Sequence, residues 1–156
     1  MGGRLGKVKD MNAPQLIPNW VDGIECETHD GRSFAKVNPA DGSVLFSVAR
    51  SQKTDMNFAV ESARNSLPDW AAVPPVKRGL MLHDIVMHMI ERKDEIAEVV
   101  HKETGKSMKD ALGEIGGSIE CGFFYASEGQ RLYGRTTTSG VPNKYASTIR
   151  QPVGVA

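Results

Sequence analysis

Between residues 54 and 133, apolar side chains recur every three or four positions. This spacing predicts α-helix. Thr54 is placed to cap a first helix over 55–69. Pro74-Pro75 favours a second helix start, whose apolar stripe continues until Gly105 stops it. A third stripe opens at Ser107 and extends toward Tyr133. Three to four long helices are therefore predicted within residues 51–133.

The third helical segment carries an unusual number of glycines, each of which costs roughly 1 kcal/mol against alanine in a helix interior. A helix tolerates such residues where close packing against a neighbour, or a ligand passing nearby, compensates. Close packing is the favoured explanation, and a nearby ligand is the alternative. The glycines concerned are Gly113, Gly116, Gly117, Gly122 and Gly129.

Strand patterns flank the helical region on both sides. Within 16–50, Asp41-Gly42 is a hairpin signal followed by alternating apolar residues, and candidate strands lie at 17–22 and 33–37. Within 134–152, β-branched residues predict an antiparallel ribbon between 135–138 and 145–150. The apolar run at 153–156 resembles the opening of a buried parallel strand. Residues 1–15, which are glycine-rich and basic, predict a mobile leader.

Composition narrows the classes of partner and compartment. Nineteen basic and nineteen acidic residues cancel, which provides no electrostatic footprint for nucleic acid or an anionic membrane. No apolar run approaches the roughly 20 residues of a membrane span, and no secretory signal is present. For Cys26 and Cys121, free thiols in a reducing cytosol are favoured over a single disulfide. A cytoplasmic protein without nucleic-acid or membrane partners is expected.

Three groups of residues are candidates for a chemical site. Cys26-Glu27-Thr28-His29 brings a thiol and an imidazole close in sequence, but a nucleophile needs them adjacent in space with a third, orienting group. Glu98 and His101 supply one Glu-x-x-His motif where di-iron bundles need two. The glycine-rich stretch 113–117 departs from the phosphate-binding pattern and follows no strand. Residue chemistry alone therefore predicts a mixed helix–strand domain without a site.

Taken in order, however, the segments resemble the N-terminal third of the aldehyde dehydrogenase superfamily. The matching stretches are Trp20-Val21-Asp22-Gly23, Val37-Asn38-Pro39-Ala40-Asp41-Gly42, Ala59-Val60 with Ala63-Arg64, Trp70-Ala71 with Pro74-Pro75 and Arg78, Glu103-Thr104-Gly105-Lys106, Glu114, Phe124-Tyr125-Ala126, Leu132-Tyr133-Gly134, and Arg150-Gln151-Pro152-Val153-Gly154-Val155. Each is weak alone, and together they are specific from about residue 16 to the last residue.

The resemblance implies an α/β fold of the aldehyde dehydrogenase type. In it, 16–50 form N-terminal β-hairpins, 51–133 the helical part of the cofactor-binding domain, 134–152 an oligomerisation ribbon, and 153–156 the start of a truncated strand of the dinucleotide-binding sheet. The implied enzyme is an oxidoreductase that converts an aldehyde to a carboxylic acid with NAD or NADP through a cysteine thiohemiacetal. It is implied to be a homo-oligomer, a dimer or tetramer joined through the ribbon.

The resemblance assigns no catalytic or cofactor-binding residue to this chain. Neither Cys26 nor Cys121 matches the nucleophile's motif, so the chain alone is expected to be inactive and to bind no cofactor. The alternative is a non-catalytic helical and β interaction module that self-associates. Two minor roles are implied within the chain: a monovalent cation held by the Val37 carbonyl and Glu103, and a substrate-tunnel wall that includes Gly117 and Cys121. A glycine at 117 would widen that tunnel for a bulky aldehyde.

Overall fold

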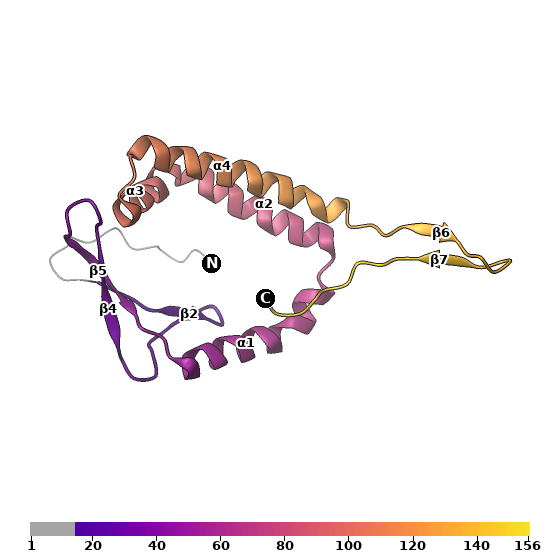
Figure 1. Cartoon of the computed structure of the whole chain (residues 1–156), viewed down its shortest axis with the longest axis horizontal. Coiled ribbons are helices and arrows are strands. Elements are labelled where there is room, and N and C mark those ends of the chain that lie inside the picture. Colours follow the sequence, from indigo (N-terminus) through magenta and orange to yellow (C-terminus); the bar gives the residue numbers. More distant parts are fainter. Residues whose placement is uncertain (1–14) are drawn as a thin grey trace. The chain divides into compact units, whose positions relative to one another are not determined.

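The computed structural model describes residues 15–156 (Figure 1). The leader predicted for 1–15 therefore falls, except for Gln15, outside the described residues. The contacts divide the chain into two compact units. One unit holds the described residues up to Ala59 together with Lys102–Gly105, and the other holds Val60–His101 and Lys106–Ala156.

The first unit is built from two small sheets. Strands β1 (Leu16–Ile17), β5 (Val44–Ala49) and β4 (Ser33–Val37) form one sheet in that order, with β1 parallel and β4 antiparallel to β5. Strands β2 (Asn19–Val21) and β3 (Ile24–Cys26) form a separate hairpin. The strand predicted at 33–37 is confirmed. The one predicted at 17–22 is divided between β1 and β2 by Pro18, which has no N–H to donate to a ladder.

The predicted hairpin turn at Asp41-Gly42 is confirmed. Gly42 has φ +76°, a region that glycine enters without steric cost, and its N–H donates to the Asn38 carbonyl at 2.8 Å. The Asn38 side chain accepts from the Ala40 N–H at 2.9 Å, which fixes the start of the turn. The register of β4 against β5 shifts between Lys36 and Val37. This turn follows directly on Val37, a residue of the expected cation site.

Helix α1 runs over Lys53–Ala72, and its start differs from the prediction. The helix begins one residue before Thr54, and Asp55 makes the capping contacts. The Asp55 carboxylate accepts the Gln52 N–H at 2.6 Å and the His29 N–H at 2.8 Å. An acceptor in the first turn satisfies an N–H group that the helix leaves unpaired. It also ties the turn at His29 to the helix.

The second unit contains helices α2 (Pro75–Glu91) and α4 (Met108–Ala126), most of α3 (Lys93–Thr104), and a 3₁₀ turn, η1 (Ser127–Gln130), after α4. The second predicted stripe is thus two helices, because Arg92 leaves helical geometry with φ −109° and ψ 18°. The predicted Ser107 cap is confirmed: its hydroxyl accepts the Asp110 N–H at 3.1 Å. Regular α-helix ends at Ala126, before the predicted limit at Tyr133.

Helices α2 and α4 lie side by side and run in opposite directions (Figure 1). Five residues form the buried core of this unit, and half-buried apolar residues of α2, α3 and α4 pack against them. The core residues are Val86, Ala97, Ala111, Ile115 and Ile119. The antiparallel pair and α3 therefore bury one common apolar face.

The glycines of α2, α4 and η1 fall into two groups according to the space around them. A methyl group added at Gly122 would overlap the Val86 side chain, one at Gly79 would overlap the Ala126 carbonyl, and one at Gly129 would overlap the Pro75 carbonyl. Nothing lies within 4 Å of a methyl group added at Gly113 or Gly117. A methyl group added at Gly116 would meet only Nζ of Lys93, at 3.7 Å. Close packing thus explains Gly122 and Gly129, but not Gly113, Gly116 or Gly117.

The ribbon consists of β6 (Thr136–Thr138) and β7 (Tyr145–Ser147), which pair antiparallel and extend beyond the end of α4 (Figure 1). Every residue of both strands is exposed. The stretch 148–156 has no regular secondary structure, and Val153 is fully exposed. A strand needs a hydrogen-bonded neighbour, so the strand at 153–156 stays a prediction. From residue 15 onward, no helix has the length and apolar character needed to traverse a lipid bilayer.

Candidate functional site

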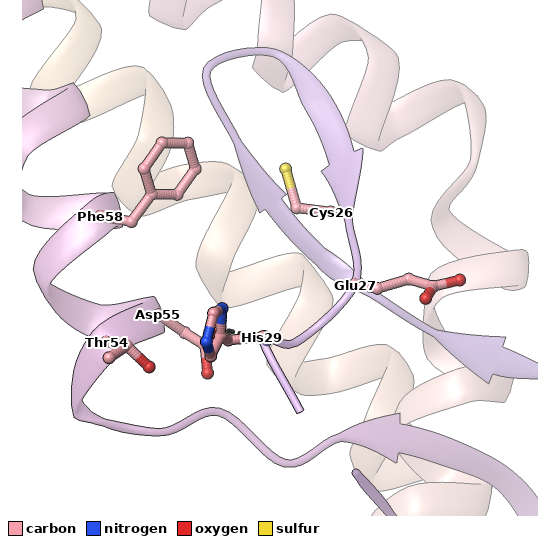
Figure 2. A pocket seen from close by; sticks show the side chains of 6 residues that line it. All are labelled: Cys26, Glu27, His29, Thr54, Asp55 and Phe58. Atoms are coloured by element: carbon pink, nitrogen blue, oxygen red, sulfur yellow. Dashed lines mark hydrogen bonds between the residues drawn. The ribbon is translucent and has the colours of Figure 1, made fainter. Parts of the chain in front are cut away.

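The Cys26–His29 segment lines a pocket of about 330 Å³ beside the first turn of α1 (Figure 2). Its walls come from the end of β3, the following turn and α1. The lining residues are Cys26, Glu27, His29, Thr54, Asp55 and Phe58. A thiol, an imidazole and a carboxylate therefore border one hollow, and their geometry decides whether they can act together.

These side chains make contacts that stabilise the fold, and they do not form a catalytic group. The half-buried Cys26 sulfur contacts the carbonyl oxygens of Val21 at 4.0 Å and Ile24 at 3.7 Å, and the Glu27 carboxylate points away from it (Figure 2). The Asp55 carboxylate is engaged by backbone N–H groups. The Gln52 N–H, and after it the His29 N–H, lower the pKa of Asp55 below its ordinary value. The pocket thus lacks the thiol–imidazole pairing that a cysteine nucleophile needs.

The two residues expected to hold a monovalent cation belong to the same unit. Val37 ends β4 and is exposed, while Glu103 is half-buried near the end of α3. Their segments meet two residues further on: a methyl group at Gly105 would lie 2.9 Å from Cγ of Pro39. The structure therefore brings the turn after Val37 against the helix end that carries Glu103. Carbonyl and carboxylate oxygens are the donors that hard cations prefer.

The two expected tunnel residues share one face of α4, since Gly117 and Cys121 are four residues apart. That face is open at both positions: nothing lies near a methyl group at Gly117, and Cys121 is an exposed free thiol. The free state of Cys26 and Cys121 agrees with the prediction of two thiols. A ligand passing close to α4, the alternative explanation for its glycines, therefore remains possible only on this open face.

Glu98 and His101 both lie on α3, and no group of three metal-ligating side chains occurs anywhere in residues 15–156. His101 instead hydrogen-bonds through Nδ1 to the Lys106 carbonyl at 2.5 Å. The glycine-rich stretch 113–117 lies inside α4, where helical hydrogen bonds engage the backbone N–H groups. It therefore offers no cradle for the phosphates of a dinucleotide.

Two contacts escaped the sequence patterns. Asp55 anchors the His29 turn across 26 residues, and Lys106 pairs with Glu114 from outside the helix that carries Glu114. An aspartate in a first helical turn is a local capping signal that could have been used. The distant partner of each residue has no local signal.

The chain matches the model of the aldehyde dehydrogenase family over residues 26–156. It is 31% identical over 136 residues to glutarate-semialdehyde dehydrogenase of Pseudomonas putida, covering 87% of this chain and 28% of that protein. It is 30% identical over 135 residues to the NADP⁺ succinate-semialdehyde dehydrogenase of Escherichia coli, covering 86% and 28%. The chain thus spans about 28% of the length of these curated relatives.

Solved structures agree with these matches. The crystal structure of an E. coli NADP-dependent enzyme superposes with a TM-score of 0.85 at 29% identity, covering 94% of this chain and 30% of the other. An aldehyde dehydrogenase from Brucella melitensis superposes with a TM-score of 0.82 at 30% identity, covering 85% and 28%. The fold is therefore of the predicted α/β aldehyde dehydrogenase type. Since the family model matches most of its length, the chain belongs to the aldehyde dehydrogenase family.

Proposed function

We propose that this chain forms the N-terminal part of an NAD- or NADP-dependent aldehyde dehydrogenase, a cytoplasmic enzyme that oxidises an aldehyde to a carboxylic acid through a cysteine thiohemiacetal. The observation that carries the proposal is the match to the family model over residues 26–156, together with the superposition of the chain on a solved structure of an NADP-dependent enzyme. Relatives named for NADP⁺ and for semialdehydes support the oxidoreductase class.

Within this proposal, the chain contributes scaffold rather than chemistry. Cys26 contacts backbone carbonyls, and Cys121 lies exposed on α4. The glycine-rich stretch 113–117 does not fit the phosphates of a dinucleotide, since it is interior helix. The chain's side chains therefore take no part in hydride transfer in this proposal, and the purified chain is expected to be inactive.

A chimera tests the proposal. The chain would replace the matched region of the E. coli NADP⁺ enzyme, and aldehyde-dependent reduction of NADP⁺ would be measured for the chimera and for the chain alone. We expect turnover by the folded chimera and none by the chain. Turnover by the chain alone would refute the scaffold role, and a folded chimera without turnover would count against the enzyme assignment.

We further propose that the Val37 carbonyl and the Glu103 carboxylate hold a monovalent cation. The contact between Pro39 and Gly105, which brings their segments together, supports this site. Thermal unfolding in KCl, compared with tetramethylammonium chloride at equal ionic strength, should show stabilisation by K⁺, because a ligand that binds the folded state raises its stability. Glu103→Gln should remove the difference between the two salts.

The open face of α4 is proposed as part of the substrate tunnel, with Gly117 and Cys121 on its wall. In the chimera, Gly117→Met should lower kcat/KM for bulky aldehydes relative to small ones. Gly113→Met, one turn earlier on the same open face, tests how far along α4 the tunnel wall extends. Unchanged selectivity in the Gly117→Met chimera would remove Gly117 from the tunnel.

The ribbon is proposed as the surface through which copies of the protein associate. An isolated two-stranded ribbon is at best marginally stable in water, and every residue of both strands of this one is exposed. Light scattering should show association that Thr138→Pro weakens. The bonds between Thr148 and Arg135 and between Ser139 and Lys144 leave the Thr138 N–H on the outer edge of the ribbon, and proline has no N–H to donate to another copy. Thr138→Val keeps the N–H and should associate normally. The non-catalytic module predicts the same association but an inactive chimera, so the two experiments separate the readings.

A further inference from the structure

We propose that His101 is a positioning residue for the cation site, holding the loop after α3 so that Glu103 is placed before the ion arrives. This inference rests on the proposed cation site and adds a residue to it. The observation behind it is the hydrogen bond between His101 Nδ1 and the Lys106 carbonyl, at 2.5 Å.

The loop concerned is short and turns sharply. Between the last residue of α3 and the Ser107 cap of α4 there are only Gly105 and Lys106. Gly105 adopts φ +72°, and the Pro39 ring closes off the space where a side chain would begin. Carbonyls at a helix end lack partners within the helix, so such a loop depends on side chains to hold its course.

His101 supplies that hold from one side. A carbonyl oxygen can only accept, so Nδ1 of His101 must be the donor and carry the proton. Neutral imidazole in that tautomer and imidazolium both keep this proton, so the bond does not depend on the charge of the ring. The contact therefore restrains the loop in either protonation state.

Lys106 is held a second time through its side chain, whose ammonium group pairs with the Glu114 carboxylate on α4. One hydrogen bond thus joins the two ends of the segment from His101 to Lys106. The Lys106 end is also attached to α4. Glu103 lies inside this closed segment. Glu103 is in the last turn of α3, and holding this helix end against fraying before binding lowers the ordering cost that a cation would otherwise incur.

The test is K⁺-dependent thermal unfolding of the chain, with tetramethylammonium chloride as the ionic-strength control. His101→Ala is expected to weaken K⁺ binding about three- to tenfold, the loss that one hydrogen bond typically carries. His101→Asn should restore binding to within about twofold, since the asparagine amide N–H takes the place of Nδ1. His101→Gln carries its amide one bond further out and should restore less. His88→Ala, an exposed histidine on α2, should leave the K⁺ response unchanged.

The outcomes separate this inference from the proposed site. A wild-type chain without any K⁺ response refutes both. A K⁺ response that Glu103→Gln abolishes but His101→Ala leaves intact refutes only the role of His101. Lower thermal stability with an unchanged K⁺ response, in both His101→Ala and His101→Asn, shows that the hydrogen bond is merely structural and also overturns the inference. Far-UV circular dichroism establishes that each variant is folded.

Discussion

Replacing Gly122 by alanine adds one methyl group at a point where α4 lies close against α2. That methyl group would overlap Cγ2 of Val86, a residue only 1% exposed. A β-branched side chain in a helix has essentially one χ1 rotamer, so Val86 cannot turn away. The helices must separate or the valine must strain.

Two opposing terms set the size of the effect. Overpacking a core costs about 1–3 kcal/mol. Exchanging glycine for alanine inside a helix returns roughly 0.5–1 kcal/mol. We therefore expect Gly122→Ala to destabilise the fold by a net of up to about 2.5 kcal/mol. Gly117→Ala, on the open face of the same helix, should gain only the stability that alanine has over glycine inside a helix.

The difference between the two variants isolates the packing term, because both contain the same helix contribution. Urea unfolding followed by far-UV circular dichroism measures it, and thermal unfolding should separate the two midpoints by a few degrees, given about 2–4 °C per kcal/mol at this size. Val86→Ala combined with Gly122→Ala should recover part of the loss, since the overlapping methyl groups are gone. Equal stabilisation by Gly122→Ala and Gly117→Ala would refute the close approach of α2 and α4.

Three further changes probe local contacts. Asp55→Asn should weaken the acid dependence of unfolding. Because the pKa of Asp55 is lowered in the folded chain, its carboxylate stabilises the fold above the ordinary pKa of 3.8, and this stabilisation is lost as pH falls below that value. Acid-unfolding curves of wild type and variant should therefore converge at low pH. Ser107→Ala should cost about 1 kcal/mol in urea unfolding through loss of the α4 cap; an unchanged midpoint would contradict the capping role. Gly105→Ala should cost more than about 1 kcal/mol, from its positive φ and from Pro39 at 2.9 Å, and a more stable variant would show that the loop is relaxed.

Local signals predicted most of the secondary structure. The Ser33–Val37 strand, the Asp41-Gly42 turn, the Ser107 cap and the proline start of α2 each depend on residues within a few positions of one another. The errors lie where a continuous apolar stripe hid a break. Arg92 interrupts α2 and α3 although apolar residues continue at helical spacing on both sides, so periodicity alone could not locate the break.

The candidate site was less accessible to such reasoning. Val37 and Glu103 were expected to act together only through the family resemblance, and they belong to segments more than 60 residues apart. The contact of Pro39 with Gly105 and the bond from His101 to Lys106 depend on how those segments meet in space. Glycine count alone likewise could not distinguish Gly122, which packs, from Gly117, which does not.

The two glycine faces of α4 have an evolutionary consequence. Positions 113 and 117 can acquire side chains of many sizes while the helix becomes more stable, whereas position 122 is held to glycine by Val86. Selection could therefore diversify the open face without eroding the fold, since gains in helix propensity would offset losses elsewhere. In a saturation library of α4, tolerated substitutions should gather at 113 and 117 and be depleted at 122.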